Sequence, residues 1–66
     1  MKIRVNAADH EAPTGATVAD LIAQLGMNPK FVAVELNQQL APRKRHAEIR
    51  LAEGDEVEIV TLVGGG

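Results

Sequence analysis

Cysteine, tryptophan and tyrosine are absent from this chain, and Phe31 is its only aromatic residue. Without cysteine there can be no disulfide, thiolate metal site or thiol nucleophile, so the fold must depend on an apolar core. Without further aromatic side chains, the stacking surface that single-stranded nucleic acids use is missing. The sequence also lacks a Walker-type phosphate loop and a GxGxxG turn, which excludes the recognisable nucleotide-binding motifs.

Long apolar runs are also missing. No run approaches the roughly 20 residues of a membrane-spanning helix, and the N-terminus lacks the apolar segment of a signal peptide. We therefore expect a cytoplasmic protein without a membrane partner. A chain of 66 residues forms one domain and buries only about 60% of the surface that its unfolded form exposes, which argues against a deep catalytic cleft. Its 45% hydrophobic residues indicate a globular protein, and its formal charge of -2 does not favour a nucleic-acid partner.

The hydrophobic pattern predicts short strands around one helix. Residues 1–6 alternate between apolar and polar types, and residues 9–13 should return as an edge strand that stops at Pro13. Asn6 and Asp9 supply the turn chemistry between them. Three further strands are predicted at 31–37, 39–42 and 57–63, with a turn of helix within 43–50.

Residues 17–26 are predicted to form the one amphipathic helix. Thr17 can cap its N-terminus with Asp20 at the third helical position, and Gly26 supplies a left-handed stop. Its apolar stripe consists of Val18, Leu21, Ile22 and Leu25. Because a lone helix can bury this stripe only on one face of a mixed sheet, the sequence predicts an α+β fold with about five strands. The first and last strands, which are the most apolar, should lie centrally.

The last predicted strand has two different faces. Glu58 should avoid the core, which assigns the alternate residues to the face that the helix covers. These residues are Val57, Ile59, Thr61 and Val63. Val60 and Leu62 then lie on the open face, where they are ordinary surface residues, are covered by other strands, or belong to a docking patch for a partner.

Charged and titratable residues form clusters without a catalytic arrangement. Four acids surround the start of the last strand: Glu53, Asp55, Glu56 and Glu58. They form either a solvated strand edge or a surface that guides an oppositely charged partner. The basic run 43–45 is explained by solvated surface as readily as by an RNA contact. His10 and His46 have no second ligand at metal spacing, so we expect exposed surface histidines, no metal site and no catalytic residue.

The sequence closes on Gly64, Gly65 and Gly66, directly after an apolar strand. Such a tail is either a frayed end or a reactive segment. Three extended residues reach roughly 10 Å, and without side chains they can enter a channel too narrow for other sequences. A terminal carboxylate is an anion at neutral pH and its carbonyl carbon is a poor electrophile, so it requires activation as an acyl phosphate or adenylate. We predict a folded domain over 1–63 and a flexible tail over 64–66.

Three stretches follow one another in a characteristic order: GATVADLIAQLG, VAVELNQQLAPR and LAEGDEVEIVTLVGGG. Together they resemble the ThiS family of bacterial sulfur carriers, which have a ubiquitin-like β-grasp fold. The similarity covers nearly the whole chain. A third glycine departs from the two that usually describe the family, although Gly65 and Gly66 still occupy the last two positions.

This resemblance implies a carrier that other proteins modify and that is not itself an enzyme. A ThiF-like adenylyltransferase, similar to ubiquitin-activating enzymes, would adenylate Gly66 with ATP, so the chain itself binds no cofactor. Sulfur from cysteine, supplied as a persulfide by a cysteine desulfurase or another donor, would give a thiocarboxylate. A ThiG-like thiazole synthase would receive this sulfur for the thiazole ring of thiamine. In this scheme Gly64 and Gly65 thread the partner's channel, Val60 and Leu62 dock, and the four acids guide the encounter.

Three other functions remain open at this point. The sulfur carrier of molybdopterin synthase would share the fold and tail but serve another pathway. A protein modifier would join Gly66 to lysine through an isopeptide bond. A β-grasp module that binds a protein or RNA would have no use for its tail.

Overall fold

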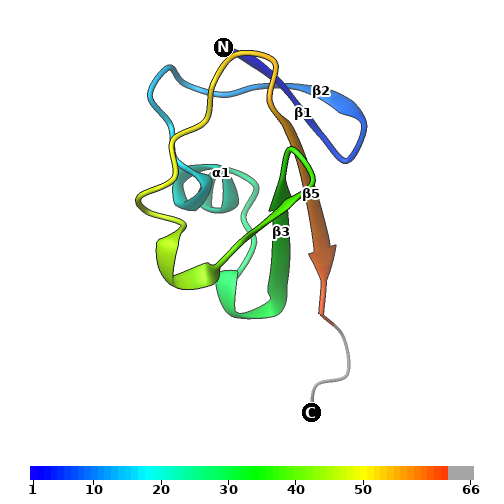
Figure 1. Ribbon diagram of the computed structural model, residues 1–66, viewed down its shortest axis with the longest axis vertical. Coiled ribbons are helices and arrows are strands. Elements are labelled where there is room, and N and C mark those ends of the chain that lie inside the picture. Colours follow the sequence, from blue (N-terminus) through cyan, green and yellow to red (C-terminus); the bar gives the residue numbers. More distant parts are fainter. Residues whose placement is uncertain (63–66) are drawn as a thin grey trace.

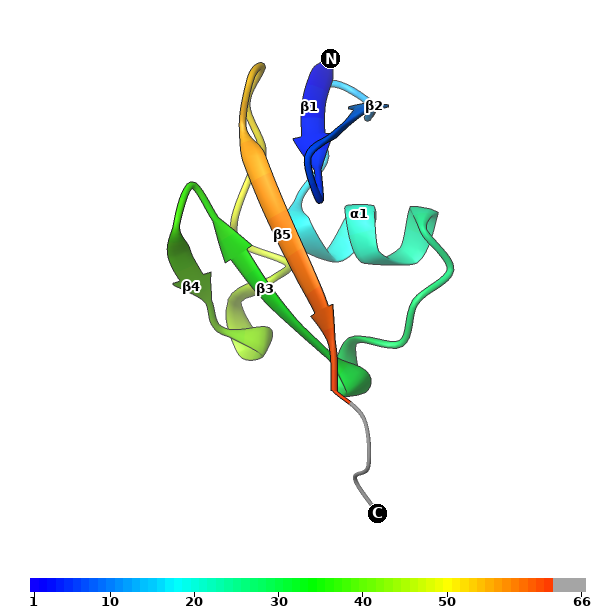
Figure 2. The same cartoon turned by 90° about the vertical axis from the view of Figure 1, so that its right-hand side faces the viewer.

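The computed structural model describes residues 1–62 as a five-stranded mixed sheet with one α-helix against one face (Figure 1, Figure 2). The strands are β1 (Lys2–Val5), β2 (Ala8–Glu11), β3 (Val32–Leu36), β4 (Gln39–Ala41) and β5 (Glu56–Thr61). The helices are α1 (Val18–Gln24) and two 3-10 turns, η1 (Pro29–Phe31) and η2 (Arg43–Arg45). The predicted α+β architecture is therefore confirmed. The predictions for Val63 and for the glycine tail lie outside the described residues.

Strand β5 forms the middle of the sheet, whose order is β2-β1-β5-β3-β4. It pairs in parallel with β1 and antiparallel with β3, while β2 and β4 pair antiparallel with their sequence neighbours and form the two edges. The first and last strands thus lie side by side in the interior of the sheet, as their apolar sequences predict. Figure 2 shows β5 crossing the whole sheet, so its final residues project beyond the end of β1.

Both hairpins turn through two residues with positive φ. These are Asn6 and Ala7 (φ 51° and 68°) and Asn37 and Gln38 (φ 50° and 71°). Positive φ at both central positions gives the turn a twist that matches the flanking strands. The assignment of Asp9 to the first turn is wrong, because the turn needs only two residues and Asp9 already pairs with Arg4 inside β2.

The two asparagines also extend the sheet with their side chains. Asn6 Oδ1 accepts a hydrogen bond from the Ile59 amide at 2.8 Å, which continues the β1–β5 ladder after β1 has ended. Asn37 Oδ1 accepts from the Glu56 amide at 2.9 Å. Each of the two asparagines therefore also connects its hairpin to the central strand β5.

Helix α1 begins and ends as the sequence predicts. Thr17 Oγ1 accepts from the Asp20 amide at 3.1 Å, and Asp20 Oδ2 accepts from the Thr17 amide at 2.9 Å, which completes a capping box. Gly26 follows the helix with φ 72°. Within residues 1–62 no helix has the length and apolar character to cross a membrane.

Between α1 and the sheet lies one apolar core. Its largest fully buried side chains are Ile3, Val18, Leu21, Ile22, Val34 and Val57. Two predictions fail at its margin. Thr61 is exposed because the end of β5 runs past the layer that α1 covers, and Phe31 belongs to η1 instead of β3. Pro29 at the first position of η1 favours this helical turn, since its ring presets the required φ.

Candidate docking surface

The two faces of β5 differ in what covers them. On the face toward α1, the side chains of Val57 and Ile59 are 1% and 7% exposed. On the other face, Val60 and Leu62 are 60% and 51% exposed. The sequence predicts these two positions on an open face, and their exposure rules out the alternative that other strands cover them.

Exposed large apolar residues of the described chain gather at one region of the sheet. They are Phe31, Leu40, Val60 and Leu62. Val60 lies directly opposite Ala33 in the β3–β5 pair, and Leu40 lies opposite Glu35 in the β3–β4 pair. The Leu62 amide donates to the Phe31 carbonyl at 2.7 Å, so the backbone beyond β5 is still held beside η1. The apolar exposure is therefore concentrated and follows the path toward the tail.

A hollow of about 300 Å³ lies on this open face, which we call the open-face hollow. Its lining consists of Asn6, Ala33, Glu35, Leu40, Glu58 and Val60. It thus combines apolar side chains with two carboxylates. A partner that presents an apolar side chain next to a cation fits this chemistry.

The two carboxylates of the hollow come from residues directly opposite each other, Glu35 on β3 and Glu58 on β5. Both residues are exposed, and among residues 1–62 neither carboxylate has an ion-pair partner. Like charges at directly opposite positions destabilise a sheet. Sequence reasoning singled out Glu58 but missed Glu35, Leu40 and Ala33, because only the strand register brings them to it.

The four acids predicted as one cluster have different roles. Asp55 uses both carboxylate oxygens within the fold: Oδ2 accepts from the Ala52 amide at 2.7 Å and Oδ1 from Asn37 Nδ2 at 3.0 Å. Glu53 Oε1 accepts from the Lys2 amide at 3.0 Å. Asp55 and Glu53 therefore hold the turn before β5 and the start of β1.

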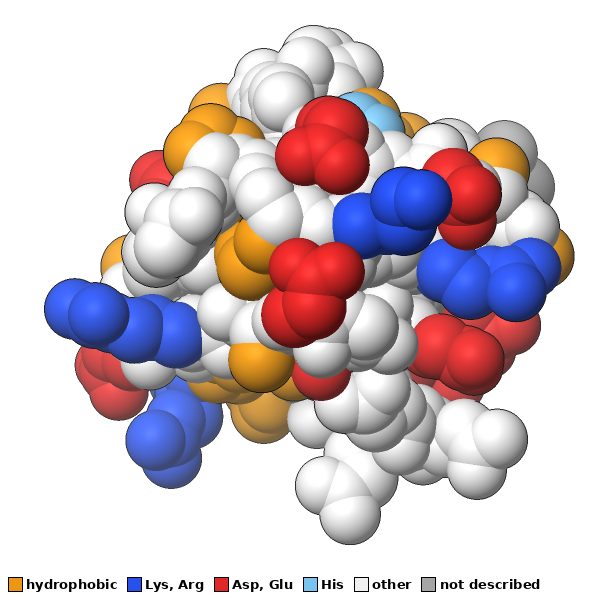
Figure 3. Space-filling view, turned by 90° about the horizontal axis from the view of Figure 1, so that it is seen from above, with side chains coloured by type: hydrophobic (Ala, Val, Ile, Leu, Met, Phe, Trp, Pro, Cys, Tyr) orange, Lys and Arg blue, Asp and Glu red, His pale blue; other side chains and the backbone are white. Residues whose placement is uncertain are grey.

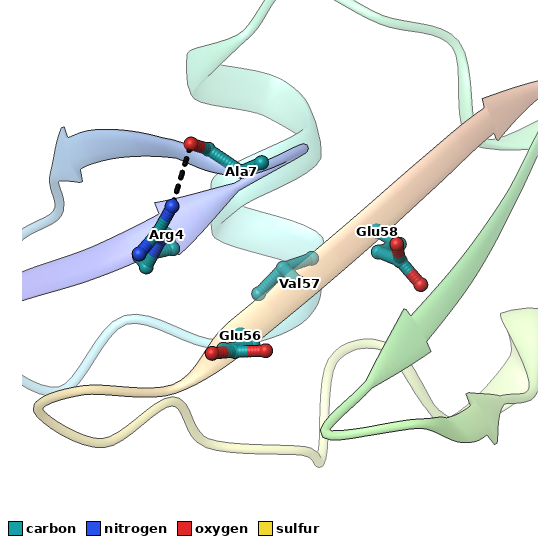
Figure 4. Close-up of a pocket in the computed structure, with 5 residues that line it drawn as sticks. All are labelled: Arg4, Ala7, Glu56, Val57 and Glu58. Atoms are coloured by element: carbon teal, nitrogen blue, oxygen red, sulfur yellow. Dashed lines mark hydrogen bonds between the residues drawn. The ribbon is translucent and has the colours of Figure 1, made fainter.

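The side chains of Glu56 and Glu58 have no such bond within residues 1–62. Figure 4 shows them along β5 beside a pocket of about 200 Å³ that Arg4 and Ala7 also line. Arg4 is directly opposite Glu56 in the sheet, yet its Nη2 donates to the Ala7 carbonyl at 2.8 Å. Of the predicted cluster, only these two glutamates have carboxylates that make no hydrogen bond within residues 1–62.

Charge is mixed elsewhere on the surface. Seen from the end that carries the N-terminus, acidic and basic side chains lie next to one another and form no area of a single sign (Figure 3). A surface on which positive and negative charges alternate does little to orient an approaching charged partner. The open-face hollow, with two acids facing each other, is the better candidate for a directed electrostatic contact.

The histidine prediction is wrong for His46. Its side chain is 4% exposed, and its Nε2 donates to the Ala41 carbonyl at 2.9 Å. The segment after η2 folds back under α1, where the His46 carbonyl accepts from the Ala19 amide at 3.0 Å, and this packing buries the ring. His10 is half-buried, with Nε2 at 3.0 Å from Gln24 Oε1. In the part of the chain that the structure describes, no group of three or more metal-binding side chains comes together.

The predicted carrier residues Gly64, Gly65 and Gly66 lie beyond the described part of the chain. What the structure describes is their approach: β5 ends at Thr61, on the opposite side of the molecule from the N-terminus in Figure 1. The open-face hollow and the exposed Leu62 lie along the last part of this path.

Known proteins are similar to this chain in both sequence and fold. The ThiS family model matches residues 3–66. The sulfur carrier protein ThiS of Escherichia coli (strain K12) is 30% identical over 66 residues, and the alignment covers all of both chains. The crystal structure of the thiamine biosynthesis protein ThiS from Geobacter metallireducens superposes with a TM-score of 0.86 at 28% identity, again over the whole of both chains. This match confirms the predicted β-grasp fold.

A longer protein contains a similar region. The thiazole synthase of Magnetococcus marinus is 39% identical over 66 residues, and this chain spans only 20% of its length. The chain thus corresponds to about a fifth of that protein and to the full length of the E. coli carrier. The chain belongs to the ThiS family.

Proposed function

We propose that this chain carries the sulfur for the thiazole ring of thiamine as a thiocarboxylate on Gly66. The observation that carries the proposal is the extent of the family match, which runs to residue 66 and so includes all three glycines. A tail that belongs to the family's own sequence argues against a chance extension. The proposal requires Gly66 to bear a free carboxylate.

The chemistry starts with activation by another protein. A carboxylate oxygen of Gly66 attacks the α-phosphorus of ATP, pyrophosphate leaves, and an acyl adenylate results. The terminal sulfur of a protein persulfide then attacks the glycyl carbonyl and AMP leaves, and a thiol cleaves the remaining S–S bond to release the thiocarboxylate. Because the chain has no cysteine and no phosphate-binding loop, a ThiF-like enzyme must supply the ATP site and a cysteine desulfurase or similar donor the persulfide.

The open-face hollow is the proposed docking surface for the adenylating enzyme. Val60 and Leu62 offer exposed apolar area near the end of β5, and Glu35 and Glu58 offer two carboxylates that have no ion pair within residues 1–62. A partner cation placed between these glutamates removes their mutual repulsion and thereby gains more from binding than it would at an isolated acid. Glu56 extends the acidic area along β5, whereas Glu53 and Asp55 serve the fold more than the partner.

Thiazole synthase is the proposed acceptor of the sulfur. The similarity of this chain to a region of two thiazole synthases supports a functional link between the carrier and that enzyme. A molybdopterin synthase has no such support among these relatives. Gly64 and Gly65 are proposed to thread the channels of both partners, since a glycine backbone presents no side chain to the channel wall.

Intact-mass analysis tests the proposal. The chain is incubated with ATP, cysteine, a cysteine desulfurase and a ThiF-like enzyme, and should gain the mass that corresponds to sulfur in place of one oxygen. Oxidation of Met1 or Met27 adds nearly the same mass, so the sample is also treated with iodoacetamide. Since the chain contains no cysteine, a single carbamidomethyl adduct localised to Gly66 by fragmentation identifies the thiocarboxylate.

Two controls define the outcome. Omission of ATP should abolish the adduct, whereas methionine oxidation would persist. If the complete mixture yields no adduct while the E. coli carrier does in parallel, the proposed function is contradicted. Higher-mass conjugates of the chain to lysine would instead indicate a protein modifier.

A further inference from the structure

A second hollow lies on the helix side of the sheet, between α1 and η2. This α1–η2 groove has a volume of about 300 Å³. Its lining includes Ile22 and Ala23 of α1, Met27 of the following turn, and His46 and Ala47 after η2. It is therefore built mainly from apolar side chains, and none of its lining residues belongs to the open-face hollow.

Two cations border this groove. Arg43 and Lys44 of η2 both line it, and both are exposed. Among residues 1–62, η2 has one ion pair, between Arg45 and Glu48 at 3.6 Å, which leaves the other two charges without a carboxylate partner. Arg43 Nη1 lies 3.4 Å from the Lys30 carbonyl, so it is kept near the groove. An apolar floor with two uncompensated cations matches a ligand that is apolar and acidic.

The groove also contains an unused acceptor. His46 is 4% exposed and lines the groove, and its Nδ1 has no hydrogen-bond partner among the described residues. Because Nε2 donates to the Ala41 carbonyl, the neutral ring has its lone pair on Nδ1. A buried acceptor without a donor is unfavourable, and an N–H from outside the chain would correct this once the groove opens slightly to admit it. A peptide backbone supplies such a donor next to its side chains.

We propose that the α1–η2 groove binds an acidic segment of a partner protein. A leucine-sized side chain fills the apolar floor, neighbouring carboxylates pair with Arg43 and Lys44, and a backbone N–H reaches His46 Nδ1. The charge and polarity of the groove decide this occupant, since a basic segment would be repelled and an uncharged one would leave both cations unused. A protein bound in this groove leaves the open-face hollow free. The carrier can therefore be held on its α1 side while its tail reacts at another protein.

Titration of the ¹⁵N-labelled full chain by NMR tests this inference. The probe is acetyl-Glu-Leu-Asp-Leu-Glu-amide, and its control is the same peptide with lysine in place of each acid. The acidic peptide should shift the amides of Ala19, Ala23 and Ala47 in a saturable way, and should shift the ring nitrogen of His46. Affinity should fall several-fold when sodium chloride rises from low to physiological concentration.

Matched variants sharpen the test. The double substitution Arg43→Glu with Lys44→Glu should weaken binding tenfold or more, and Ala23→Arg should block the groove. Lys2→Glu makes the same kind of charge reversal on β1 and should leave the affinity unchanged. Saturation absent up to millimolar peptide, equal binding of the lysine peptide, or shifts confined to the open-face hollow would each overturn the inference. Thiocarboxylate formation on Gly66 should be unchanged in the double variant, which separates this inference from the proposed function.

Discussion

Val57 and Val60 are the same residue type on the same strand, three positions apart, with opposite surroundings. Val57 is 1% exposed beneath α1, whereas Val60 is 60% exposed on the open face. The first contributes to stability through burial, and the second leaves apolar area that only another molecule can cover. The difference shows that an apolar residue of this sheet acquires its role from the layer above it and not from its chemistry.

The charged residues repeat this contrast. At the start of α1, the Thr17 side chain and the Asp20 carboxylate form a complete capping box, so both have a hydrogen-bond partner. On the open face, Glu35 and Glu58 are directly opposite each other without an ion pair among the described residues. Such an arrangement does not serve the stability of the isolated domain. A surface that is unfavourable in the free protein and well formed for a cation suits recognition.

The largest effect is expected from a change in the glycine tail. Gly65→Trp should reduce thiocarboxylate formation about a hundredfold or more, because an indole cannot follow a glycine backbone through a narrow channel and a small misplacement of the reacting group is costly. Its free energy of unfolding, measured by urea titration, should remain within about 0.5 kcal/mol of the parent. Gly65→Ala is the milder control. Full thiocarboxylate yield from the tryptophan variant would contradict threading.

Next in size is the substitution on the covered face. Val57→Ala removes buried methyl groups and leaves a cavity under α1, which should lower the free energy of unfolding by about 2 to 3 kcal/mol. A domain of this length has a total stability of about 3 to 10 kcal/mol, so the midpoint of thermal unfolding should fall visibly in circular dichroism. A stability equal to that of the parent would mean that the covered face is less important to the fold than its burial indicates.

The matched substitution on the open face should have the reverse profile. Val60→Ala should leave the free energy of unfolding within about 0.5 kcal/mol of the parent. It should lower kcat/KM for adenylation about fivefold, as expected if the side chain contributes about 1 kcal/mol to an interface. Pyrophosphate release by the ThiF-like enzyme measures the rate. Equal stability losses in the Val57 and Val60 variants would break the comparison.

The last and smallest of these expected effects, and the only stabilising one, concerns the acid pair. Glu35→Lys replaces a like-charge pair with an opposite-charge pair and should raise the free energy of unfolding by about 0.5 kcal/mol at low salt. The same change should slow association with the adenylating enzyme, because it cancels the net negative charge of the pair that attracts a partner cation. Gln38→Lys, in the exposed turn before β4, is the control for added charge. An increase in both stability and association rate would exclude the pair as a recognition element.

Local features could be predicted from the sequence because their causes are local. The limits of α1 depend on Thr17 and Asp20 at its start and on Gly26 after its end, which act within a few residues. The alternation along β5 assigns Val57 and Val60 to opposite faces without knowledge of the partner strands. The exposed Thr61 shows the limit of this reasoning. Alternation assigns a face but does not say where along a strand the covering layer ends.

Contacts between distant segments could not be predicted in this way. Glu35 reaches Glu58 only through the register of β3 on β5, and Leu40 joins them through the register of β4 on β3. His46 carries no local signal of burial, since it follows three basic residues that lie on the surface. Its burial comes from the return of the chain under α1, which the hydrogen bond from the Ala19 amide maintains.

The sequence by itself determined the fold class, the limits of the helix, the two faces of the last strand and the absence of any thiol or nucleotide motif, because each of these depends on residue types and short spacings. Only the tertiary structure decided which side chains meet. The open-face hollow and the α1–η2 groove both join residues from separate elements, and the pairing of strands and the packing of α1 are decided by the burial of one shared core. Such burial is a property of the whole chain, and no single stretch of sequence contains it.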